Sequence, residues 1–307
     1  MTWMGSRPHI LMLFLDGVGI GRKDSSNPFF HVQLDALGGL LGGAIPSLRN
    51  AYLSTRLASL KPINATLGME GLPQSGTGQT SLLTGINAPR FIGRHFGPYP
   101  YSSLKPVLRE NNIFRVLSGL QRRVWYANAF PQKYFDHISS RSSHMTAITM
   151  SWLFSGFSLN DSESLERGEA ISADITNERW SQMGYPAMPV LTPQEAGMRL
   201  MNILRGYDFV LFEYWLTDHA GHSRSMQEAV SVLRSLDRFL EGILDVFDYQ
   251  RMTLILTSDH GNLEDMSVKT HTRNPVPLLC VGANHGAIAS RIRNLTHIAP
   301  AIIGALS

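Results

Sequence analysis

The sequence predicts an α/β fold in which a mostly parallel sheet is covered by helices on both faces. The first observation is a set of continuous apolar runs of strand length, which is typical of strands buried on both faces. These runs lie at Ile10–Leu15, Asp208–Trp215, Met252–Thr257 and Val276–Val281. The second observation is that segments of helical period lie between such runs. Strands that alternate with helices favour a parallel sheet with both faces covered.

The predicted elements follow one another with clear boundaries. The first strand, Ile10–Leu15, ends at Asp16-Gly17. A helix is predicted over Pro193–Leu204, because Thr192 before Pro193 makes a favourable cap and first turn. Another is predicted over Gln227–Phe247, where apolar residues recur at a helical period. In sheets of this kind, functional side chains gather in loops at the carboxyl ends of the strands.

The segment 131–189 has a different character. It is polar, rich in serine and interrupted, with short helical stretches near Thr146–Phe154 and Ser162–Ile171. We expect it to be a small inserted lid over one end of the sheet, with residues 1–130 and 190–307 forming the core. The alternative is a long irregular connection that belongs to the core itself.

Composition narrows the class of protein. Hydrophobic residues make up 43% and charged residues 17% of the chain, which is the balance of a globular domain. The net charge is only +3, without a basic run long enough to follow a nucleic-acid backbone, so no nucleic-acid partner is expected. The single cysteine, Cys280, excludes a disulfide within the chain and a cysteine-based metal site. The apolar run Ile10–Leu15 is too short for a signal peptide or a membrane span, so we expect a cytoplasmic location without membrane contact.

Four segments place side chains of the metal-binding type beside the predicted strands. They contain Asp16, then Asp218 and His222, then Asp259 and His260, and finally His271. Asp218 and His222 are four residues apart, so on a helical turn they would share one face and could bind one ion. Any one of these histidines could be structural. Together, three carboxylates and three imidazoles suit two divalent ions, Zn²⁺ or Mn²⁺. Two such ions about 4 Å apart can stabilise both the entering and the leaving oxygen of phosphoryl transfer.

Ser75 is the predicted nucleophile. It lies in Gly71–Gly85, where small residues precede an apolar helical stretch, so its hydroxyl can lie at the amino terminus of a helix. There the helix dipole and free N–H groups favour an anionic phosphate. A metal ion would supply the activation that a free serine lacks. The alternative is that these residues only cap the helix. The segment is not a phosphate-binding P-loop, because no Gly-Lys-Ser/Thr follows.

These motifs resemble the metalloenzyme branch of the alkaline phosphatase superfamily, which includes cofactor-independent phosphoglycerate mutase and phosphopentomutase. The similar segments are LDGVG, QSGTGQ, TDHAGH, SDHGN and THTRNPVPLL, in the order of the family. The resemblance implies an alkaline phosphatase-like fold. It also implies one metal site made by Asp218, His222 and His271. It implies a second site made by Asp16, Asp259 and His260, which the Ser75 oxygen bridges or completes.

The expected reaction depends on two departures from the family mutases. Gln79 stands where they have a histidine, and Gly76 stands where they have an acid. The segment 131–189 is also much shorter than their insertion. Its lysines and arginines are Lys133, Arg141, Arg167 and Arg179. A mutase must keep a charged intermediate away from water while it re-orients, and a small lid suits this poorly.

We therefore expect a two-metal phosphohydrolase, a phosphomonoesterase or phosphodiesterase that acts through a phosphoserine. A phosphomutase is the alternative, and a non-catalytic, metal-stabilised binding protein is a remote one. The substrate would be a small phosphorylated molecule, and Arg90, Arg94 and His95 are expected to bind its remote anionic part. The alternative for these three is that they are solvated loop charges. No feature of the sequence predicts an oligomeric state.

Overall fold

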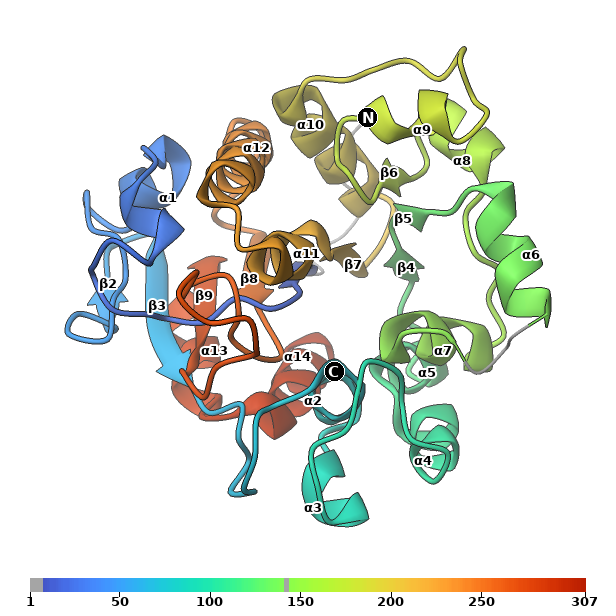
Figure 1. Ribbon diagram of the computed structural model, residues 1–307. Helices are drawn as coiled ribbons and strands as arrows, with labels where there is room; N and C mark the ends of the chain where they lie inside the picture. Colours follow the sequence, from blue (N-terminus) through green and yellow to red (C-terminus); the bar gives the residue numbers. More distant parts are fainter. Residues whose placement is uncertain (1–7, 141–143) are drawn as a thin grey trace.

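The computed structural model describes residues 8–140 and 144–307, and at its centre is a seven-stranded sheet (Figure 1). The strand order is β2-β3-β9-β8-β1-β7-β4. The strands are β1 (His9–Leu15), β2 (Leu53–Ser54), β3 (Ala58–Ile63), β4 (Val124–Tyr126), β7 (Phe209–Tyr214), β8 (Met252–Thr257) and β9 (Val276–Gly282). Strand β1 pairs in parallel with β7 and β8, and every residue of these three strands is buried. The predicted mostly parallel, doubly covered sheet is confirmed.

Strand β9 runs against the main direction of the sheet. It pairs antiparallel with β8 on one side and with β3 on the other. Residues 258–275 join β8 to β9 without a helix, whereas a parallel neighbour would need a longer crossover connection. The start of β9 therefore lies at the same edge of the sheet as the ends of β1, β7 and β8.

Helices cover the two faces of the sheet over two separate buried clusters (Figure 1). On one face lie η1 (Pro28–Phe30), α1 (Asp35–Leu40), α10 (Pro193–Leu204) and α12 (Met226–Leu244). On the other lie α2 (Ser75–Thr84), α4 (Leu104–Asn111), α5 (Ile113–Gly119), α7 (Ala147–Phe154), α13 (His285–Arg291), η2 (Leu295–His297) and α14 (Ile298–Leu306). Two further helices, α3 (Ala88–Ile92) and α11 (Leu216–Ser223), follow α2 and β7.

The two long helices predicted from the sequence are present. Helix α10 begins at Pro193, and Thr192 forms a reciprocal capping box with Glu195, which explains the sharp start. Helix α12 buries an apolar face that includes Leu233 and Leu240. Among the described residues, no helix has both the length and the apolar character needed to cross a membrane.

The segment 131–189 contributes to two different packing units. Its elements are α6 (Gln132–Ser140), α7, α8 (Ser162–Glu166), β6 (Ile171–Ser172), which pairs with β5 (Asn128–Ala129), and α9 (Glu178–Gln182). Helix α7 packs into the main core through Ile148 and Trp152. By contrast, Leu165 and Trp180 belong to a small separate cluster with Ala129. The later part of the segment therefore has a core of its own beside the sheet.

Candidate metal centre

The six predicted metal ligands come together at one edge of the sheet. Asp16 follows β1, Asp218 and His222 lie on α11 after β7, Asp259 and His260 follow β8, and His271 precedes β9. They form two groups, Asp218 with His222 and His271, and Asp16 with Asp259 and His260. Within each group one ligand atom per residue lies within 4.8 Å of the others. The two groups are those that the family resemblance implies.

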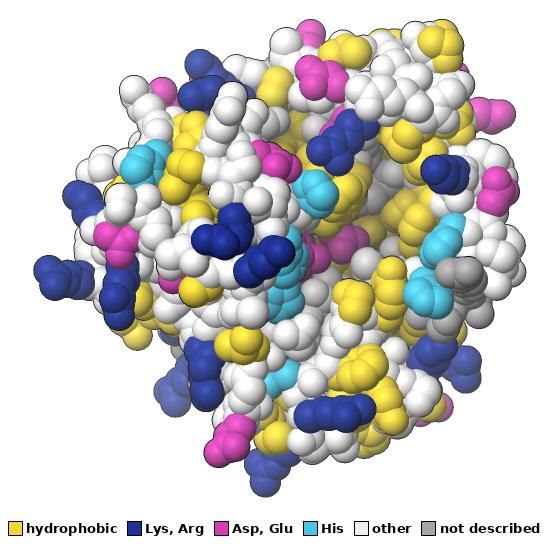
Figure 2. All heavy atoms as spheres, in the orientation of Figure 1, with side chains coloured by type: hydrophobic (Ala, Val, Ile, Leu, Met, Phe, Trp, Pro, Cys, Tyr) yellow, Lys and Arg dark blue, Asp and Glu magenta, His cyan; other side chains and the backbone are white. Residues whose placement is uncertain are grey.

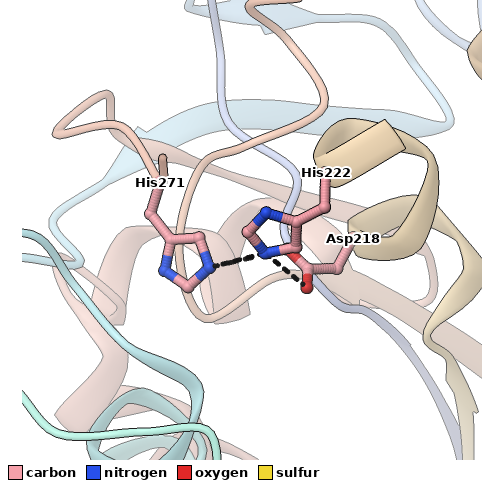
Figure 3. A group of neighbouring side chains, drawn as sticks. All are labelled: Asp218, His222 and His271. Carbon is pink, nitrogen blue, oxygen red and sulfur yellow. Dashed lines mark hydrogen bonds and ion pairs between the residues drawn. The ribbon is translucent and has the colours of Figure 1, made fainter. Parts of the chain in front are cut away.

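Helix α11 and the loop before β9 build the first group (Figure 3). His222 Nε2 lies 3.3 Å from Asp218 Oδ2 and 3.2 Å from His271 Nε2. His271 Nε2 lies 3.8 Å from Asp218 Oδ1. Figure 3 shows the three side chains pointing toward one another from the helix and from the loop. One helical turn separates Asp218 from His222, so the helix itself aligns these two.

Backbone carbonyls fix which ring nitrogen of each histidine faces the centre of this group. His271 Nδ1–H donates to the Pro73 carbonyl over 2.8 Å, and His222 Nδ1–H donates to the Lys269 carbonyl over 3.3 Å. A carbonyl can only accept, so Nδ1 carries the proton when the ring is neutral. Nε2 of each ring then presents its lone pair toward Asp218, as a metal ligand must.

The second group is buried and includes the predicted nucleophile. His260 Nε2 lies 3.4 Å from Asp16 Oδ1, 3.6 Å from Asp259 Oδ2 and 3.0 Å from Ser75 Oγ. Ser75 is the first residue of α2 and is only 7% exposed. Gln74, which precedes it, makes no capping hydrogen bond with its side chain. The Ser75 hydroxyl therefore lies at a helix amino terminus and against the second group at once.

The two groups adjoin each other. The rings of His260 and His271 stack with centroids 3.8 Å apart and an angle of 14° between their planes. One ring belongs to each group, so ions held by the two groups would be neighbours. That is the arrangement that two-metal phosphoryl transfer requires.

The charges of the second group fit a bound cation. Asp16 Oδ1 and Asp259 Oδ2 are buried and have no hydrogen-bond partner among the described residues. Burial, reinforced by neighbouring carboxylates, raises the pKa of Asp16 well above its usual value and that of Asp259 to about 8. Burial lowers the pKa of His260 well below its usual value. Such burial is costly for the folded chain unless a positive charge pairs with the carboxylates. A divalent cation would supply that pairing.

Two glycines allow the loops to approach this closely. Gly17 has a φ of +67°, and a Cβ at this position would overlap the Asp218 carboxylate. Gly78 on α2 packs against Asp259, where a Cβ would lie 2.9 Å from the Asp259 Cβ. A larger residue at Gly17 would push the loop of Asp16 away from Asp218, and one at Gly78 would push α2 away from Asp259.

Glu264 supports the site and was not predicted from the sequence. Its carboxylate is 1% exposed and accepts hydrogen bonds from the amides of Gly19 and Asn262, each over 2.8 Å. It also accepts from the Thr272 hydroxyl and, over 3.0 Å, from Asn274 Nδ2. These donors belong to the loop after β1 and to both ends of the connection between β8 and β9, around the metal ligands. The signal in the sequence was an acid two residues beyond the SDHGN motif.

Glu213 is a second carboxylate that sequence reasoning missed. It lies on β7, where its Oε2 accepts a hydrogen bond of 2.6 Å from the Tyr126 hydroxyl. Its Oε1 has no partner in the part of the chain that the structure describes. Burial raises its pKa to about 7. Sequence reasoning missed it because it lies within the run Asp208–Trp215, which the pattern predicts as an apolar strand. A single acid in a buried strand is unusual, and that was the available signal.

The three residues expected to bind the remote part of the substrate lie in different settings. Arg94 and His95 line a cavity of about 430 Å³ that Gln74, the neighbour of Ser75, also lines. The Arg94 guanidinium lies 5.4 Å from the Phe96 ring. Arg90 is exposed on α3 and is not among the residues that line this cavity.

Sequence comparisons agree with these features. A family model described as the metalloenzyme superfamily matches residues 8–307. The chain is similar to the 2,3-bisphosphoglycerate-independent phosphoglycerate mutases of Mycoplasma genitalium, with 31% identity over 125 residues, and of Roseobacter denitrificans, with 33% over 151. These matches cover 39% and 45% of the chain, but only 24% and 30% of the length of the relatives. The names of the relatives favour the phosphomutase alternative over the predicted phosphohydrolase.

Solved structures share the fold. An alkaline phosphatase from the Antarctic bacterium TAB5 superposes with a TM-score of 0.55 at 12% identity, over 98% of this chain and 99% of that one. A phosphoglycerate mutase from Leishmania mexicana gives 0.57 at 10% identity, over 98% of this chain and 95% of that one. At such low identity the likeness concerns the fold alone, and it confirms the alkaline phosphatase-like architecture.

Proposed function

The chain belongs to the metalloenzyme superfamily, and we propose that it is a phosphotransferase that uses two divalent ions and Ser75 as its nucleophile. The observation that carries this proposal is the position of Ser75 Oγ, 3.0 Å from His260 Nε2 within the buried second group. A serine in that position touches the atoms that would hold a metal ion, at the start of a ten-residue helix. Both features favour attack on a phosphate.

Each group of side chains would hold one ion. Asp218, His222 and His271 would bind the first, and Asp16, Asp259 and His260 would bind the second, together with the Ser75 oxygen. Mixed imidazole and carboxylate ligands suit Mn²⁺ and Zn²⁺. When bound, the two ions supply positive charge for the entering and leaving oxygens.

The proposed reaction has two steps. In the first, Ser75 Oγ forms a bond to the phosphorus of a phosphate ester while the bond to the ester oxygen breaks. The alcohol leaves with the proton that the serine hydroxyl gives up, and Ser75 carries the phosphoryl group. In the second step, another oxygen attacks this phosphoserine and its proton returns to Ser75. Water as the attacking group yields inorganic phosphate, whereas a second hydroxyl of the substrate yields an isomer.

The fate of the phosphoserine separates two candidate functions. The relatives named as phosphoglycerate mutases favour a phosphomutase, and we place this reaction first. Net hydrolysis is the second candidate. Segment 131–189 has few lysine and arginine side chains that could hold a charged intermediate away from water. Arg167 is paired with Glu163 and Glu169, and Arg141 lies outside the described residues. Figure 2 shows a hollow beside this segment with acidic side chains at its base, which gives water a route in.

The substrate in this proposal is a small phosphorylated molecule with a second anionic group. Arg94 and His95 line the cavity next to Gln74, so a group bound there would lie beside the phosphate that Ser75 attacks. An arginine can bind a carboxylate or phosphate through two parallel hydrogen bonds. Arg90 does not line this cavity, so its assignment to the second anionic group has less support.

The experiment uses chain that has been stripped of metal and reloaded with Mn²⁺ or with Zn²⁺. Esters with an isotopically labelled phosphoryl group are then offered as a panel. Label that moves to another oxygen of the same molecule would establish the phosphomutase, and label in inorganic phosphate would establish the hydrolase. Full metal content without turnover of any ester would contradict both and favour a metal-stabilised binding protein.

A further inference from the structure

Trp215 places a partly exposed indole on the helix face that carries two of the metal ligands. Its backbone angles are helical, with φ −88° and ψ −9°, and it is the N-cap of α11. Asp218 and His222 follow it by three and seven residues, so all three side chains lie along one stripe of the helix. The Trp215 side chain remains 39% exposed, so part of the indole is open to solvent.

Arg179 reaches this indole from segment 131–189. Its guanidinium lies 5.8 Å from the centre of the Trp215 ring system. The backbone around it is firmly held, because the Arg179 amide donates to Asp174 over 2.8 Å and the next side chain, Trp180, is buried. Among the described residues, Arg179 has no carboxylate within ion-pair distance. This cation therefore lies near an aromatic ring on the helix of two metal ligands, without a direct ion pair among the described residues.

A second ring, that of His219, completes the surroundings of the indole. The His219 imidazole meets Trp215 edge-on, with ring centres 6.0 Å apart and planes at 82°. His219 is itself paired with Glu228 over 3.7 Å. One side of the indole is thus bordered by His219 and another by Arg179, and the exposed remainder is free to contact a ligand. A built aromatic surface of this kind suits a flat ring, which can stack on the indole.

We propose that Trp215 and Arg179 form a subsite for a flat aromatic or heteroaromatic ring in the organic part of the substrate. This inference rests on the proposed function, since the ring would belong to the ester whose phosphoryl group the two ions bind. The indole would supply the stacking surface, and the guanidinium would supply N–H donors for acceptor atoms at the edge of the ring. The ring is a different part of the substrate from the anionic group assigned to Arg94.

The test compares two ligands that cannot be hydrolysed, phenylphosphonate and methylphosphonate. Both offer the metal centre the same phosphonate, and only one carries a ring. Binding of each to the metal-loaded chain is measured by calorimetry. We expect phenylphosphonate to bind roughly tenfold more tightly, because stacking on an aromatic side chain contributes about that factor.

Three variants test whether a preference for phenylphosphonate depends on the Trp215 indole. Trp215→Ala should bring the ratio of the two affinities close to one, and Trp215→Phe should keep most of it because a ring remains. Tyr52→Ala is the matched control, since Tyr52 is a 72% exposed aromatic residue on the chain just before β2. It should keep the full ratio. Metal content of every variant is measured to show that the centre is intact.

A Trp215→Ala variant that keeps the full preference would overturn the subsite, as would a native chain that binds both ligands equally or neither of them. Turnover of phenyl phosphate tests the proposed function separately. A chain that binds phenylphosphonate through Trp215 but never turns over an ester would retain the subsite and lose the phosphotransferase assignment.

Discussion

At the scale of single residues, two hydroxyls at the start of α2 have different surroundings, and this difference supports Ser75 as the proposed nucleophile. Ser75 Oγ faces His260, whereas Thr77 Oγ1 donates to the Gln74 carbonyl over 3.1 Å and accepts from the Phe96 amide over 3.2 Å. Thr77 is thus used by the backbone, as its place in the first turn suggests. Only Ser75 keeps its hydroxyl at the metal ligands.

We therefore expect Ser75→Ala to lower kcat by orders of magnitude, because the covalent route is lost. Thr77→Ala should leave most of the activity and lower the free energy of unfolding by roughly 1 kcal/mol, since the partly buried Phe96 amide loses a partner. Mass spectrometry of enzyme quenched during turnover should find the phosphoryl group on Ser75. Phosphate on Thr77, or a Ser75→Ala variant with normal turnover, would show the assignment to be wrong.

The buried carboxylates give the metal-free chain a pH dependence with a definite sign. Asp259 has a pKa of about 8 when folded and a reference value of 3.8. The folded state therefore holds a proton that the unfolded state has already lost. Stability from this proton is fully present at low pH and is lost as pH rises through the folded pKa. The pKa of His260 is lowered from 6.5, so its effect on stability has the opposite sign and is confined to pH values below about 6.5.

The free energy of unfolding of the metal-free chain should thus fall with rising pH up to about pH 8, most clearly above about pH 6.5 where His260 no longer opposes the fall, and should level off above about pH 8. Thermal unfolding in the presence of a chelator would measure this, with Asp259→Asn as the comparison. The variant should show a flatter profile, because its amide does not ionise. Saturating Mn²⁺ should remove the fall in the native chain, since the cation stabilises the ionised carboxylates. A native profile as flat as that of the variant would contradict the explanation.

At the scale of elements, the site depends on loops that Glu264 joins. It links the loop after β1 to the loop after β8 and to the stretch before β9. Asn262, whose amide it accepts, donates in turn to Asp218 Oδ1 over 2.6 Å. An amide in place of the carboxylate cannot accept from donors on both sides, so the loops would lose their common anchor.

Glu264→Gln should weaken Mn²⁺ binding roughly tenfold or more, as loss of groups that orient metal ligands commonly does. The effect should be larger at the site of Asp218, His222 and His271, because Glu264 contacts residues beside two of them. Glu169→Gln, an exposed acid paired with Arg167, is the control and should bind normally. Spectroscopic titration with Mn²⁺ distinguishes the outcomes, and equal affinities for the two variants would count against the role.

Sequence patterns identified some elements well and missed others for physical reasons. The buried runs around β1, β7, β8 and β9 and the capped helix α10 carry strong local signals. Strand β3 was missed because polar residues interrupt it: its burial alternates, and Lys61 lies within it. Glu264 left only a weak signal, an acid two residues beyond SDHGN, because its role appears only when loops far apart in the chain meet.

At the scale of the whole molecule, the direction of β9 brings His271 into the site. In an all-parallel sheet, a residue ahead of a strand would lie at the edge opposite to the ends of β1 and β8. The antiparallel course of β9 reverses this, and His271 stacks on His260. The resemblance to a family implies a group of His271 with Asp218, and the structure places these two side chains close together. Periodicity alone could not have shown the strand direction on which this depends.

The same arrangement predicts where a substrate extends from the metal centre. Gln74, which precedes Ser75, lines the same cavity as Arg94 and His95. An anionic group of the substrate bound in this cavity would therefore lie beside the phosphate that Ser75 attacks. His95 Nε2 is buried without a partner in the described structure, and burial lowers the pKa of this side chain. A neutral His95 beside Arg94 would accept or donate a hydrogen bond without adding charge, so Arg94 should carry the electrostatic attraction.

Arg94→Ala should therefore raise KM for a doubly anionic ester roughly tenfold or more, by loss of a charge-assisted contact. Metal content and KM for an ester without the second anion should stay close to native. Arg90→Ala is the control, because Arg90 lies on α3 outside the cavity lining, and its kinetics should be unchanged. Equal KM changes in the two variants would indicate diffuse attraction of anions by the surface, and no change in either would remove Arg94 from the site.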